Sequence, residues 1–467
     1  MSIQTINPTT GEVLETFESY NERQINEALE QARHAFVQWR ATPFAERANH
    51  LHSIASYLRD HQAELARLAV LEMGKSITEA EAEVEKCAWS CDYFAEHAQE
   101  FLREEHVATN ATQSYIAFHP LGVILAVMPW NFPYWQVFRF AAPTLMAGNT
   151  AVLKHASNVS RVALEIERIF QEAGLPQGVL RTVLVPGSQT HRLIEDPRIA
   201  AVTLTGSDAA GVEVAAASGH VLKKTVLELG GYDAFIVLED ADLDQAAQVA
   251  VTARFQNNGQ SCIAAKRFIV VEAVAEAFER KFVEAASKLQ VGNPLNRETR
   301  IGPMARGDLR DALDGQVQAS IQMGARVLLG GKPIEGKGYF YAPTIVTDVT
   351  SDMPMFREET FGPAAAVIHA RDTEHAVELA NDSVFGLSCN LWTRDIEQAR
   401  RLTSRIAAGS LFINGMTASD PRLPFGGIKR SGYGRELSWF GIREFVNIQT
   451  VWIGPKVENV PTQAASE

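Results

Sequence analysis

The sequence predicts an α/β fold with two domains and a small additional β element. Its 467 residues are enough for two or three domains. From about residue 113 onward, short apolar runs alternate with segments whose apolar residues follow helical spacing. This alternation is typical of a parallel sheet that is covered by helices on both faces.

The first half of the chain begins with helices and then alternates. Apolar residues at helical spacing predict helices over residues 22–40, 45–72 and 78–104. The alternating elements that follow are strands over 113–119, 122–128, 150–154, 180–185, 200–204 and 222–228, and helices over 135–147, over 160–173 and from Ser207.

The second half continues in the same style. The sequence contains no internal repeat and no low-complexity tract. The predicted elements are strands over 234–238, 267–271, 326–329, 343–347, 364–368 and 410–413, and helices over 242–255, 274–288 and 308–323.

Composition and charge exclude several classes of protein. A formal net charge of −13 argues against nucleic acid as the main partner. The longest apolar stretch, residues 121–130, is too short to span a membrane, and the first residues lack the pattern of a secretory signal. Four cysteines make no disulfide framework, and Cys87 and Cys91 lack the histidines that would suggest a metal site. We expect a cytoplasmic protein with reduced thiols, no metal and no membrane partner.

Cys262 is the first candidate for chemistry. It lies in FQNNGQSCIAAKRF, among small and polar residues, with Gly259 positioned for a tight turn just before it. A thiol in a polar, partly exposed setting can act as a nucleophile, whereas a buried one is inert. Cys389, in FGLSCNLW, fits the inert alternative better.

Two further segments carry candidate catalytic groups. Glu228 ends the apolar run of TVLELGG, where a strand gives way to a Gly-Gly loop, and a carboxylate there suits a general base. Asn131 lies between two prolines in PWNFP, and its amide can donate to a developing oxyanion. The alternatives are a solvated loop carboxylate and an asparagine that caps the next helix.

Glycine-rich segments point to a ligand that contains phosphate. In LTGSDAAG a strand runs into Gly206 and Ser207 at a helix N-terminus, where free N–H groups favour anions. The loop LPFGGIKRSGYGRE contains four glycines, and loops this rich in glycine more often shape a site than a core. The motif GxGxxG does not occur in the chain.

These segments together resemble the NAD(P)-dependent aldehyde dehydrogenase superfamily. The motifs PWNFP, LTGS, ELGG, GQSC, EETFGP and PFGGIKRSGYGRE occur in that order, and the similarity spans about residues 5–455. Within the superfamily, the chain looks most like the succinate-semialdehyde dehydrogenases. The resemblance implies the aldehyde dehydrogenase fold, with a Rossmann-like cofactor domain that binds its dinucleotide without GxGxxG, an α/β catalytic domain and a β oligomerisation arm.

The resemblance also implies the catalytic roles. Cys262 matches the nucleophile that forms a thiohemiacetal and then a thioester. Asn131 matches the oxyanion donor, together with the backbone N–H of Cys262. Glu228 matches the base that activates the hydrolytic water.

The resemblance implies NADP as the preferred cofactor, with NAD also possible. Many members that prefer NAD carry a glutamate at the position of Ser157, and its charge would repel a 2′-phosphate by roughly 3 kcal/mol at ~5 Å. Ser157 carries no charge and so removes this repulsion. The alternative is that Ser157 is a neutral helix cap with no role in cofactor choice. The positions that match cofactor contacts are Trp130, Asn131, Lys154, Ser157, Gly206, Ser207, Leu229, Glu359 and Phe361.

The substrate residues follow from the same resemblance. Arg139 matches an arginine of the succinate-semialdehyde dehydrogenases, and its guanidinium would bind the far carboxylate of the substrate, with Ser419 assisting. A salt bridge on the surface or between domains is the alternative for Arg139. Some relatives carry a second arginine six residues before the nucleophile, where this chain has Gln256. We expect Trp135, Phe132 and Phe425 to line the substrate tunnel.

The family architecture implies three parts and self-association. The cofactor domain would comprise residues 1–107 and 121–230, the catalytic domain 231–432, and the arm 108–120 and 440–457. The exposed edge of such an arm needs a partner, which predicts a homodimer or a dimer of dimers.

The sequence thus predicts oxidation of succinate semialdehyde to succinate with NADP. The nearest alternative is a dehydrogenase of broader specificity that accepts glutarate semialdehyde or aliphatic aldehydes. An alternative of another class is a cysteine esterase that needs no cofactor, and a third is a binding protein on an inactive enzyme scaffold. The intact set of Cys262, Glu228 and Asn131 argues against the third.

Overall fold

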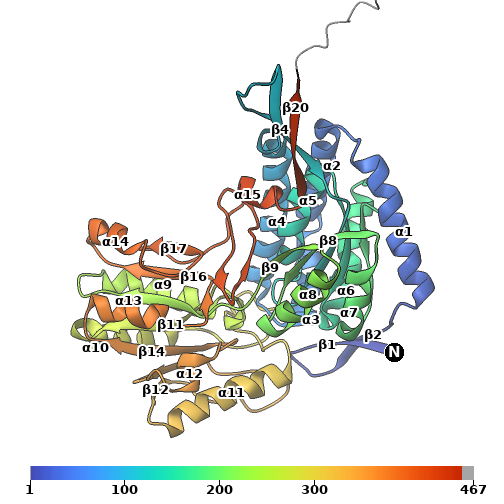
Figure 1. Cartoon of the computed structure of the whole chain (residues 1–467). Coiled ribbons are helices and arrows are strands. Elements are labelled where there is room, and N and C mark those ends of the chain that lie inside the picture. Colours follow the sequence, from blue (N-terminus) through green and yellow to red (C-terminus); the bar gives the residue numbers. More distant parts are fainter. Residues whose placement is uncertain (1, 455–467) are drawn as a thin grey trace, which may run out of the picture.

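Two large β-sheets and a projecting arm organise the chain (Figure 1). The computed structural model describes residues 2–454. Residue 1 of the predicted cofactor domain and residues 455–457 of the predicted arm lie outside the described residues. The chain is α/β, as the sequence predicts, and the domain boundaries stay a prediction.

The first large sheet has the strand order β19-β9-β8-β5-β6-β7. Neighbouring strands are parallel, except that β19 runs antiparallel to β9. The residues of β5 and β6 are buried throughout, as expected for parallel strands covered on both faces. The strands are β5 (Val123–Met128), β6 (Thr150–His155), β7 (Leu180–Thr182), β8 (Ile199–Thr205), β9 (Lys224–Glu228) and β19 (Gly432–Tyr433).

Helices from the first half of the chain pack around this sheet (Figure 1). The first helix starts with a capping box, in which Asn21 and Gln24 satisfy each other's backbone N–H groups. An N-terminal hairpin, β1 (Ser2–Ile6) and β2 (Val13–Glu18), precedes it. The helices are α1 (Glu22–Trp39), α2 (Phe44–Asp60), α3 (Gln62–Met73), α4 (Ile77–Phe101), α5 (Trp135–Met146), α6 (Ser160–Glu172), α7 (Thr190–Glu195) and α8 (Asp208–His220), with 3₁₀ turns η1 (Ser157–Val159) and η2 (Gly187–Gln189).

The second large sheet has the order β12-β13-β14-β11-β10-β16-β17. Its strands are parallel except for the edge strand β12. The strands are β10 (Asp233–Val237), β11 (Ala265–Val271), β12 (Arg326–Leu329), β13 (Thr344–Thr347), β14 (Ala364–Ala370), β16 (Ser388–Trp392) and β17 (Ser410–Ile413).

Helices and short segments complete the second half. Phe235, Phe268 and Trp392 form part of an aromatic core on one face of the second sheet. The helices are α9 (Leu243–Phe255), α10 (Glu272–Ala286), α11 (Gly307–Gln322), α12 (Pro354–Arg357), α13 (Thr373–Asn381), α14 (Ile396–Leu402) and α15 (Ser438–Ile442), with the 3₁₀ turn η3 (Gln256–Gly259) and the strand pair β15 (Phe385–Gly386) and β18 (Ile428–Lys429).

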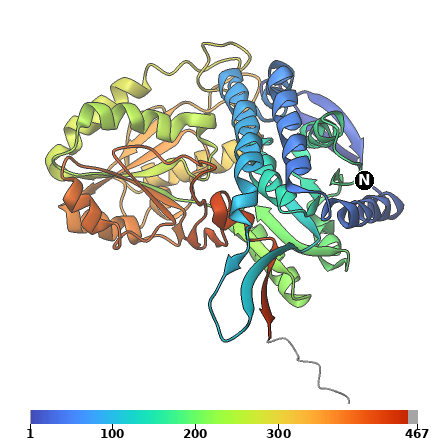
Figure 2. The same cartoon turned by 90° about the horizontal axis from the view of Figure 1, so that it is seen from above.

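The arm is a three-stranded antiparallel sheet in the order β20-β4-β3. It pairs β4 (Gln113–Pro120) with the distant β20 (Val446–Ile453), and β3 (Glu105–His106) adds a short third strand. In Figure 2 the arm projects away from the region where the two large lobes meet. Within residues 2–454, no helix has the length and hydropathy needed to cross a membrane.

The structure corrects two predicted elements in the first half. The predicted helix over 45–72 is two helices, because the backbone leaves helical geometry at His61 (φ −110°, ψ 13°). The predicted strand over 180–185 ends at Thr182.

In the second half, β16 was not predicted, although it lies between β10 and β17 and contains the buried Cys389. Its apolar run is short and includes Asn390, whose side-chain oxygen accepts a hydrogen bond from the N–H of Thr417.

Candidate active site

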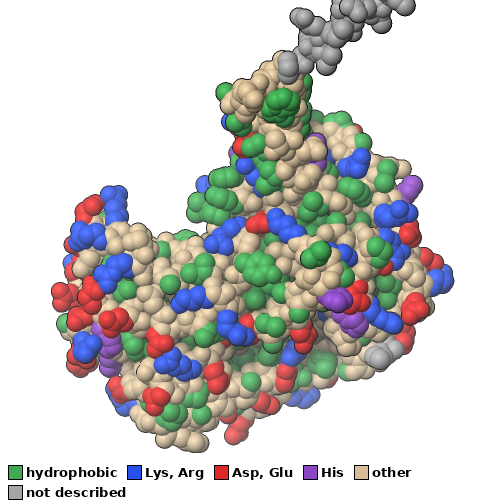
Figure 3. Space-filling view, viewed as in Figure 1, with side chains coloured by type: hydrophobic (Ala, Val, Ile, Leu, Met, Phe, Trp, Pro, Cys, Tyr) green, Lys and Arg blue, Asp and Glu red, His purple; other side chains and the backbone are tan. Residues whose placement is uncertain are grey.

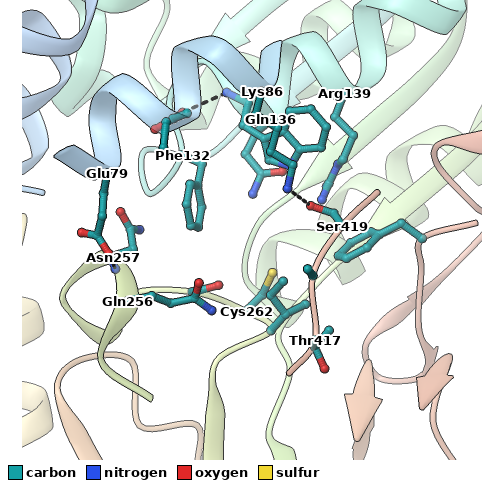
Figure 4. Close-up of a pocket in the computed structure, with 17 residues that line it drawn as sticks. Glu79, Lys86, Phe132, Gln136, Arg139, Gln256, Asn257, Cys262, Thr417 and Ser419 are labelled. Atoms are coloured by element: carbon teal, nitrogen blue, oxygen red, sulfur yellow. Dashed lines mark hydrogen bonds between the residues drawn. The ribbon is translucent and has the colours of Figure 1, made fainter. Parts of the chain in front are cut away.

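Cys262 lies where two cavities meet. The first cavity has a volume of about 210 Å³ and is shown in Figure 4. The second has a volume of about 240 Å³ and continues on the other side of the thiol. Cys262 is in the wall of both, so groups held in the two cavities can meet at its sulfur. Of the four cysteines, Cys262 is partly exposed and the others are buried.

A left-handed turn places Cys262 in this position. Asn257, Asn258 and Gly259 have φ values of 54°, 57° and 72° in succession. A side chain at Gly259 would collide with the backbone of Gly362, so the turn requires a glycine there. Cys262 follows three residues later, at the start of the segment that leads into β11.

Buried hydrogen bonds hold this turn against the first half of the chain. The Asn257 N–H donates to Glu79 Oε1 at 2.7 Å, and Asn257 Nδ2 donates to the Asn131 carbonyl at 2.8 Å. Asn258 Nδ2 donates to the Gly74 carbonyl at 2.9 Å. The turn is thus bonded to the Glu79 side chain on α4, to the C-cap of α3 and to the loop after β5, and this fixes the loop of the thiol between the two sheets.

Asn131 is buried beside the thiol, as the oxyanion role requires. Its Nδ2 donates to the Gln260 carbonyl at 3.1 Å, and its side-chain oxygen accepts no hydrogen bond in the described residues. An amide nitrogen carries two N–H groups, so one remains for a ligand in the second cavity. The role itself stays a prediction.

Burial governs the ionisation of Cys262. It raises the pKa of the thiol to about 12, although Arg139 and Lys266 act in the opposite direction. Lys266 does not lower the pKa of the Cys262 thiol further, because its amino group is engaged elsewhere. Its amino group donates to the Cys262 carbonyl at 2.7 Å and forms an ion pair with Glu359 at 3.0 Å. In this arrangement the thiol is protonated at neutral pH.

Glu228 ends β9 as predicted, but its carboxyl group faces the glycine-rich loop. It is 2% exposed, and a Cβ at Gly426 would lie 2.7 Å from Glu228 Oε1. Glu228 is not in the wall of either cavity. Burial, and then the nearby Glu436, raise the pKa of this carboxyl group well above its ordinary value. To act on water at Cys262, the side chain has to turn away from Gly426.

Arg139 lines the first cavity but is committed to a buried ion pair. Its Nε pairs with the Glu436 carboxylate, and its NH2 group donates to Thr205 Oγ1 at 3.2 Å. The guanidinium lies 4.5 Å from the centre of the Phe425 ring, and the residue is 1% exposed. This is the salt bridge that the sequence left open as the alternative for Arg139.

The second cavity collects most of the predicted cofactor residues. Trp130 and Phe361 face each other edge to face, with ring centres 5.7 Å apart. A Cβ at Gly206 would meet only Leu204, at 3.6 Å, so the missing side chain leaves free volume. The predicted residues in this wall are Trp130, Asn131, Gly206, Ser207, Leu229, Glu359 and Phe361.

A third, open cavity of about 670 Å³ contains the remaining two predicted cofactor residues, Lys154 and Ser157. Lys154 ends β6 and is 8% exposed, and burial lowers the pKa of its amino group. Within residues 2–454 it forms no ion pair and no side-chain hydrogen bond. A buried cation without a partner fits a ligand with ribose hydroxyl groups or a phosphate. Arg306 lies in the same wall, paired with Asp308.

The first cavity brings together every predicted substrate residue. Its walls include Phe132, Trp135, Arg139, Ser419 and Phe425. Figure 4 shows Arg139 and Ser419 at one end of the cavity, with the sulfur of Cys262 pointing into it from below. Gln256, the position noted in the sequence, is also in the wall.

Two residues near the site were missed by the sequence reasoning. Glu436 lies in the glycine-rich motif, but nothing in the motif indicates that it pairs with Arg139, which is 297 residues away in the chain. Lys86 lies on α4, and its amino group donates to Ser419 Oγ at 2.7 Å. One signal in the sequence could have revealed Lys86. It lies beside Cys87, next to the buried face of α4.

Comparisons with known proteins identify the family of the chain. A family model described as the aldehyde dehydrogenase family matches residues 1–451. A protein of Synechocystis sp., described as a probable NADP(+) succinate-semialdehyde dehydrogenase, is 53% identical over 453 residues, which cover 97% of this chain and 100% of that protein. The Escherichia coli succinate semialdehyde dehydrogenase Sad, described as using NAD(P)+, is 50% identical over 96% of this chain and 97% of its own.

A solved structure is similar over nearly the whole chain. It is a succinic semialdehyde dehydrogenase from Streptococcus pyogenes in complex with NADP+. The two chains share 39% identity and superpose with a TM-score of 0.95, covering 97% of this chain and 100% of the other.

The raised pKa of the Cys262 thiol predicts slow alkylation at neutral pH. In protein without ligands, the rate of modification by iodoacetamide should rise about tenfold per pH unit from pH 7 to 10, because the thiolate fraction rises in that proportion below the pKa. Mass spectrometry of the peptide that contains Cys262 measures the rate, and Cys262→Ser is the control. A rate that levels off below pH 9 contradicts the described environment.

Proposed function

The chain belongs to the aldehyde dehydrogenase family, and we propose that it oxidises succinate semialdehyde to succinate with NADP, and less well with NAD. It is an NAD(P)-dependent oxidoreductase. The observation that carries the proposal is the place of Cys262 in the walls of two cavities, one suited to an aldehyde and one suited to a nicotinamide.

The residues of the second and third cavities fit a dinucleotide. Trp130 and Phe361 would flank the nicotinamide, and Glu359 would bind its ribose. The N-terminus of α8, with Gly206, would receive the diphosphate, because its backbone N–H groups favour anions. When bound, NADP accepts the hydride that leaves the aldehyde carbon.

Lys154 and Ser157 would bind the adenosine ribose of the same cofactor. Lys154 supplies a positive charge without a carboxylate partner in the described chain, and Ser157 brings no charge that would repel a 2′-phosphate. Both residues line the third cavity, so both can reach one ligand group. This pair accounts for a preference for NADP.

Cys262 begins the reaction as its thiolate, which attacks the aldehyde carbon after the thiol has lost its proton to water. The new carbon–sulfur bond makes a thiohemiacetal, and the carbonyl oxygen gains the negative charge. Asn131 Nδ2 and the Cys262 backbone N–H would donate to that oxygen, which lowers the energy of the charged intermediate. Departure of the hydride leaves a thioester on Cys262.

Glu228 would complete the cycle as a general base. Its carboxylate takes a proton from water, and the resulting hydroxide attacks the thioester carbon and displaces the Cys262 thiolate. Because burial raises the pKa of Glu228, the carboxyl group must lose its proton before it can accept one from water, and it is then a stronger base than an exposed carboxylate. Because Glu228 faces Gly426 in the structure, the step requires its side chain to rotate toward the thiol.

We further propose that the chain forms a homodimer, or a pair of dimers, through the arm. β20 is an edge strand, and its side chains Ile448 and Trp452 are 61% and 52% exposed. Figure 3 shows some hydrophobic side chains at the surface of the arm. A sheet edge with exposed apolar residues favours pairing with a second copy. The cytoplasm is the proposed location, which suits four free cysteines.

Replacement of Glu228 should separate the two halves of the reaction. Glu228→Gln is expected to release a burst of about one NADPH per active site and then to turn over roughly 10²- to 10⁴-fold more slowly than wild type, because the thioester forms but is not hydrolysed. Stopped-flow absorbance measures the burst, and Cys262→Ala, which should show neither phase, is the control. Wild-type steady-state turnover in Glu228→Gln would refute the assignment.

The cofactor preference should respond to residue 157. Ser157→Glu is expected to lower kcat/KM for NADP on the order of 100-fold and to change that for NAD little, since the introduced charge opposes the 2′-phosphate by roughly 3 kcal/mol. Ser157→Ala removes the hydroxyl without adding charge and should change the ratio less than tenfold. Equal losses with both cofactors in Ser157→Glu would show that residue 157 does not contact the 2′-phosphate.

The arm should control the oligomeric state. The double variant Ile448→Asp, Trp452→Asp is expected to sediment as a monomer where wild type is a dimer or larger, because charge on both exposed apolar positions opposes association. Leu222 is 94% exposed and lies in the turn between α8 and β9. Leu222→Asp is therefore the matched control and should keep the wild-type mass. Analytical ultracentrifugation reports the mass. A wild-type monomer would end this part of the proposal.

A further inference from the structure

Lys266 is a buried cation at the junction of three segments of the active site, and the reaction scheme gives it no role. It lies in β11, four residues after Cys262, and is fully buried. Its amino group donates to the Gly231 carbonyl at 2.6 Å and to the Cys262 carbonyl at 2.7 Å, and it pairs with Glu359 Oε1 at 3.0 Å. An ammonium group has three donors, and these three acceptors use all of them.

The three segments approach one another closely around this amino group. A Cβ at Gly231 would lie 2.5 Å from the Cys262 carbonyl oxygen, so a glycine is required there. A Cβ at Gly230 would lie 2.7 Å from Glu359 Oε2 and would displace the carboxylate. Gly230 and Glu359 are both in the wall of the second cavity. The side of the carboxylate that carries Oε2 therefore borders the space proposed for the nicotinamide half of the cofactor.

The two carboxylate oxygens of Glu359 have different surroundings. Oε1 pairs with the Lys266 amino group and accepts a hydrogen bond from the Gly231 N–H at 3.3 Å. Oε2 accepts no hydrogen bond within residues 2–454, although the side chain is only 20% exposed. A partly buried carboxylate oxygen without a donor fits a ligand that brings one. Glu359 is thus anchored through one oxygen and open to a ligand through the other.

Lys266 and Glu359 are each other's only ion-pair partners among residues 2–454. Asp233, at the start of β10, is a second carboxyl group near Lys266, but its oxygens accept hydrogen bonds from the N–H of Ser388 at 3.0 Å and from the Ser388 hydroxyl. Burial raises the pKa of Asp233 to about 7, and the charge of Lys266 acts in the opposite direction. The contact of the Lys266 amino group with a carboxylate is therefore its contact with Glu359.

We propose that Lys266 is a positioning residue, which holds Glu359 with its free oxygen directed at the ribose of the nicotinamide half of NADP. The inference rests on the proposed function, and it adds a residue that is in the wall of neither active-site cavity. A glutamate side chain that is fixed before the ligand arrives loses less conformational freedom on binding, so the complex is tighter. Because the same amino group bonds to the Cys262 carbonyl, it also ties the position of this carboxylate to that of the thiol.

Loss of the Lys266 amino group would have a structural consequence and a functional one. The carbonyl groups of Gly231 and Cys262 would lose their donor, which destabilises the fold. Glu359 would keep only the long hydrogen bond from the Gly231 N–H, which weakens its contact with the ribose. Structural damage affects every ligand of the protein, whereas a change in the position of Glu359 affects only ligands that reach it.

The test compares equilibrium binding of NADP with that of 2′,5′-ADP, which carries the adenosine ribose and its 2′-phosphate but no nicotinamide ribose. Lys266→Met should weaken NADP binding roughly tenfold or more, as expected when a hydrogen bond to a charged group is lost, and leave 2′,5′-ADP binding within about twofold. Isothermal titration calorimetry of the full-length protein measures both affinities. Lys288→Met removes a surface lysine that is paired with Glu284 at the same distance of 3.0 Å, and it should bind both ligands as wild type does.

A double-mutant cycle determines whether Lys266 acts through Glu359. Glu359→Gln should itself weaken NADP binding, and Lys266→Met added to it should cost less than about twofold more, because residues that act together are not additive. If the two losses add in full, Lys266 does not act through Glu359 and the inference is wrong. Equal losses of affinity for NADP and for 2′,5′-ADP in Lys266→Met would also overturn it, because they would show a role in folding alone.

The variant Lys266→Gln keeps the inference testable if Lys266→Met does not fold. It retains donors for the two carbonyl groups but lacks the charge that pairs with Glu359, so it should lose affinity for NADP and keep affinity for 2′,5′-ADP. Unchanged NADP binding in Lys266→Gln would overturn the inference. If the wild-type protein binds neither NADP nor 2′,5′-ADP, the proposed cofactor is wrong instead, so the two failures are distinguishable.

Discussion

The active site depends on the buried left-handed turn at Asn257, Asn258 and Gly259. Left-handed backbone costs roughly 1–2 kcal/mol per residue for most L-amino acids, less for asparagine and least for glycine. The two asparagine side chains stabilise the turn by bonding to carbonyl groups of Gly74 and Asn131. The same bonds that stabilise the turn therefore join the two halves of the chain around Cys262, which explains why a polar segment occupies a buried position.

A second constraint is the cluster of buried charges behind the thiol. Arg139 lies near two carboxyl groups, Glu228 and Glu436, and it pairs with Glu436. Burial, and then the charge of Glu436, raise the pKa of Glu228, while Arg139 acts in the opposite direction. The charge of Arg139 opposes the rise in pKa of both Glu228 and Glu436.

Much of this site could be predicted from sequence because its motifs are local. PWNFP, ELGG and GQSC each place one candidate catalytic residue at the end of a strand or in a turn, and residues of all three motifs lie in the wall of the second cavity. Long-range pairing could not be predicted. The contacts of Arg139 with Glu436 and of Lys86 with Ser419 join residues about 300 positions apart, and no residue spacing encodes them. The break at His61 is a backbone change within an otherwise helical pattern, and apolar periodicity does not reveal it.

The most direct test of the account is the rate of nicotinamide reduction when purified protein is mixed with succinate semialdehyde. NADP and NAD are compared, and succinate is identified as the product. The account predicts faster reduction of NADP than of NAD and one succinate for each NADPH formed. Release of an alcohol from an ester without nucleotide, with no nicotinamide reduction in the presence of the aldehyde, would contradict it and would support a cysteine hydrolase in its place.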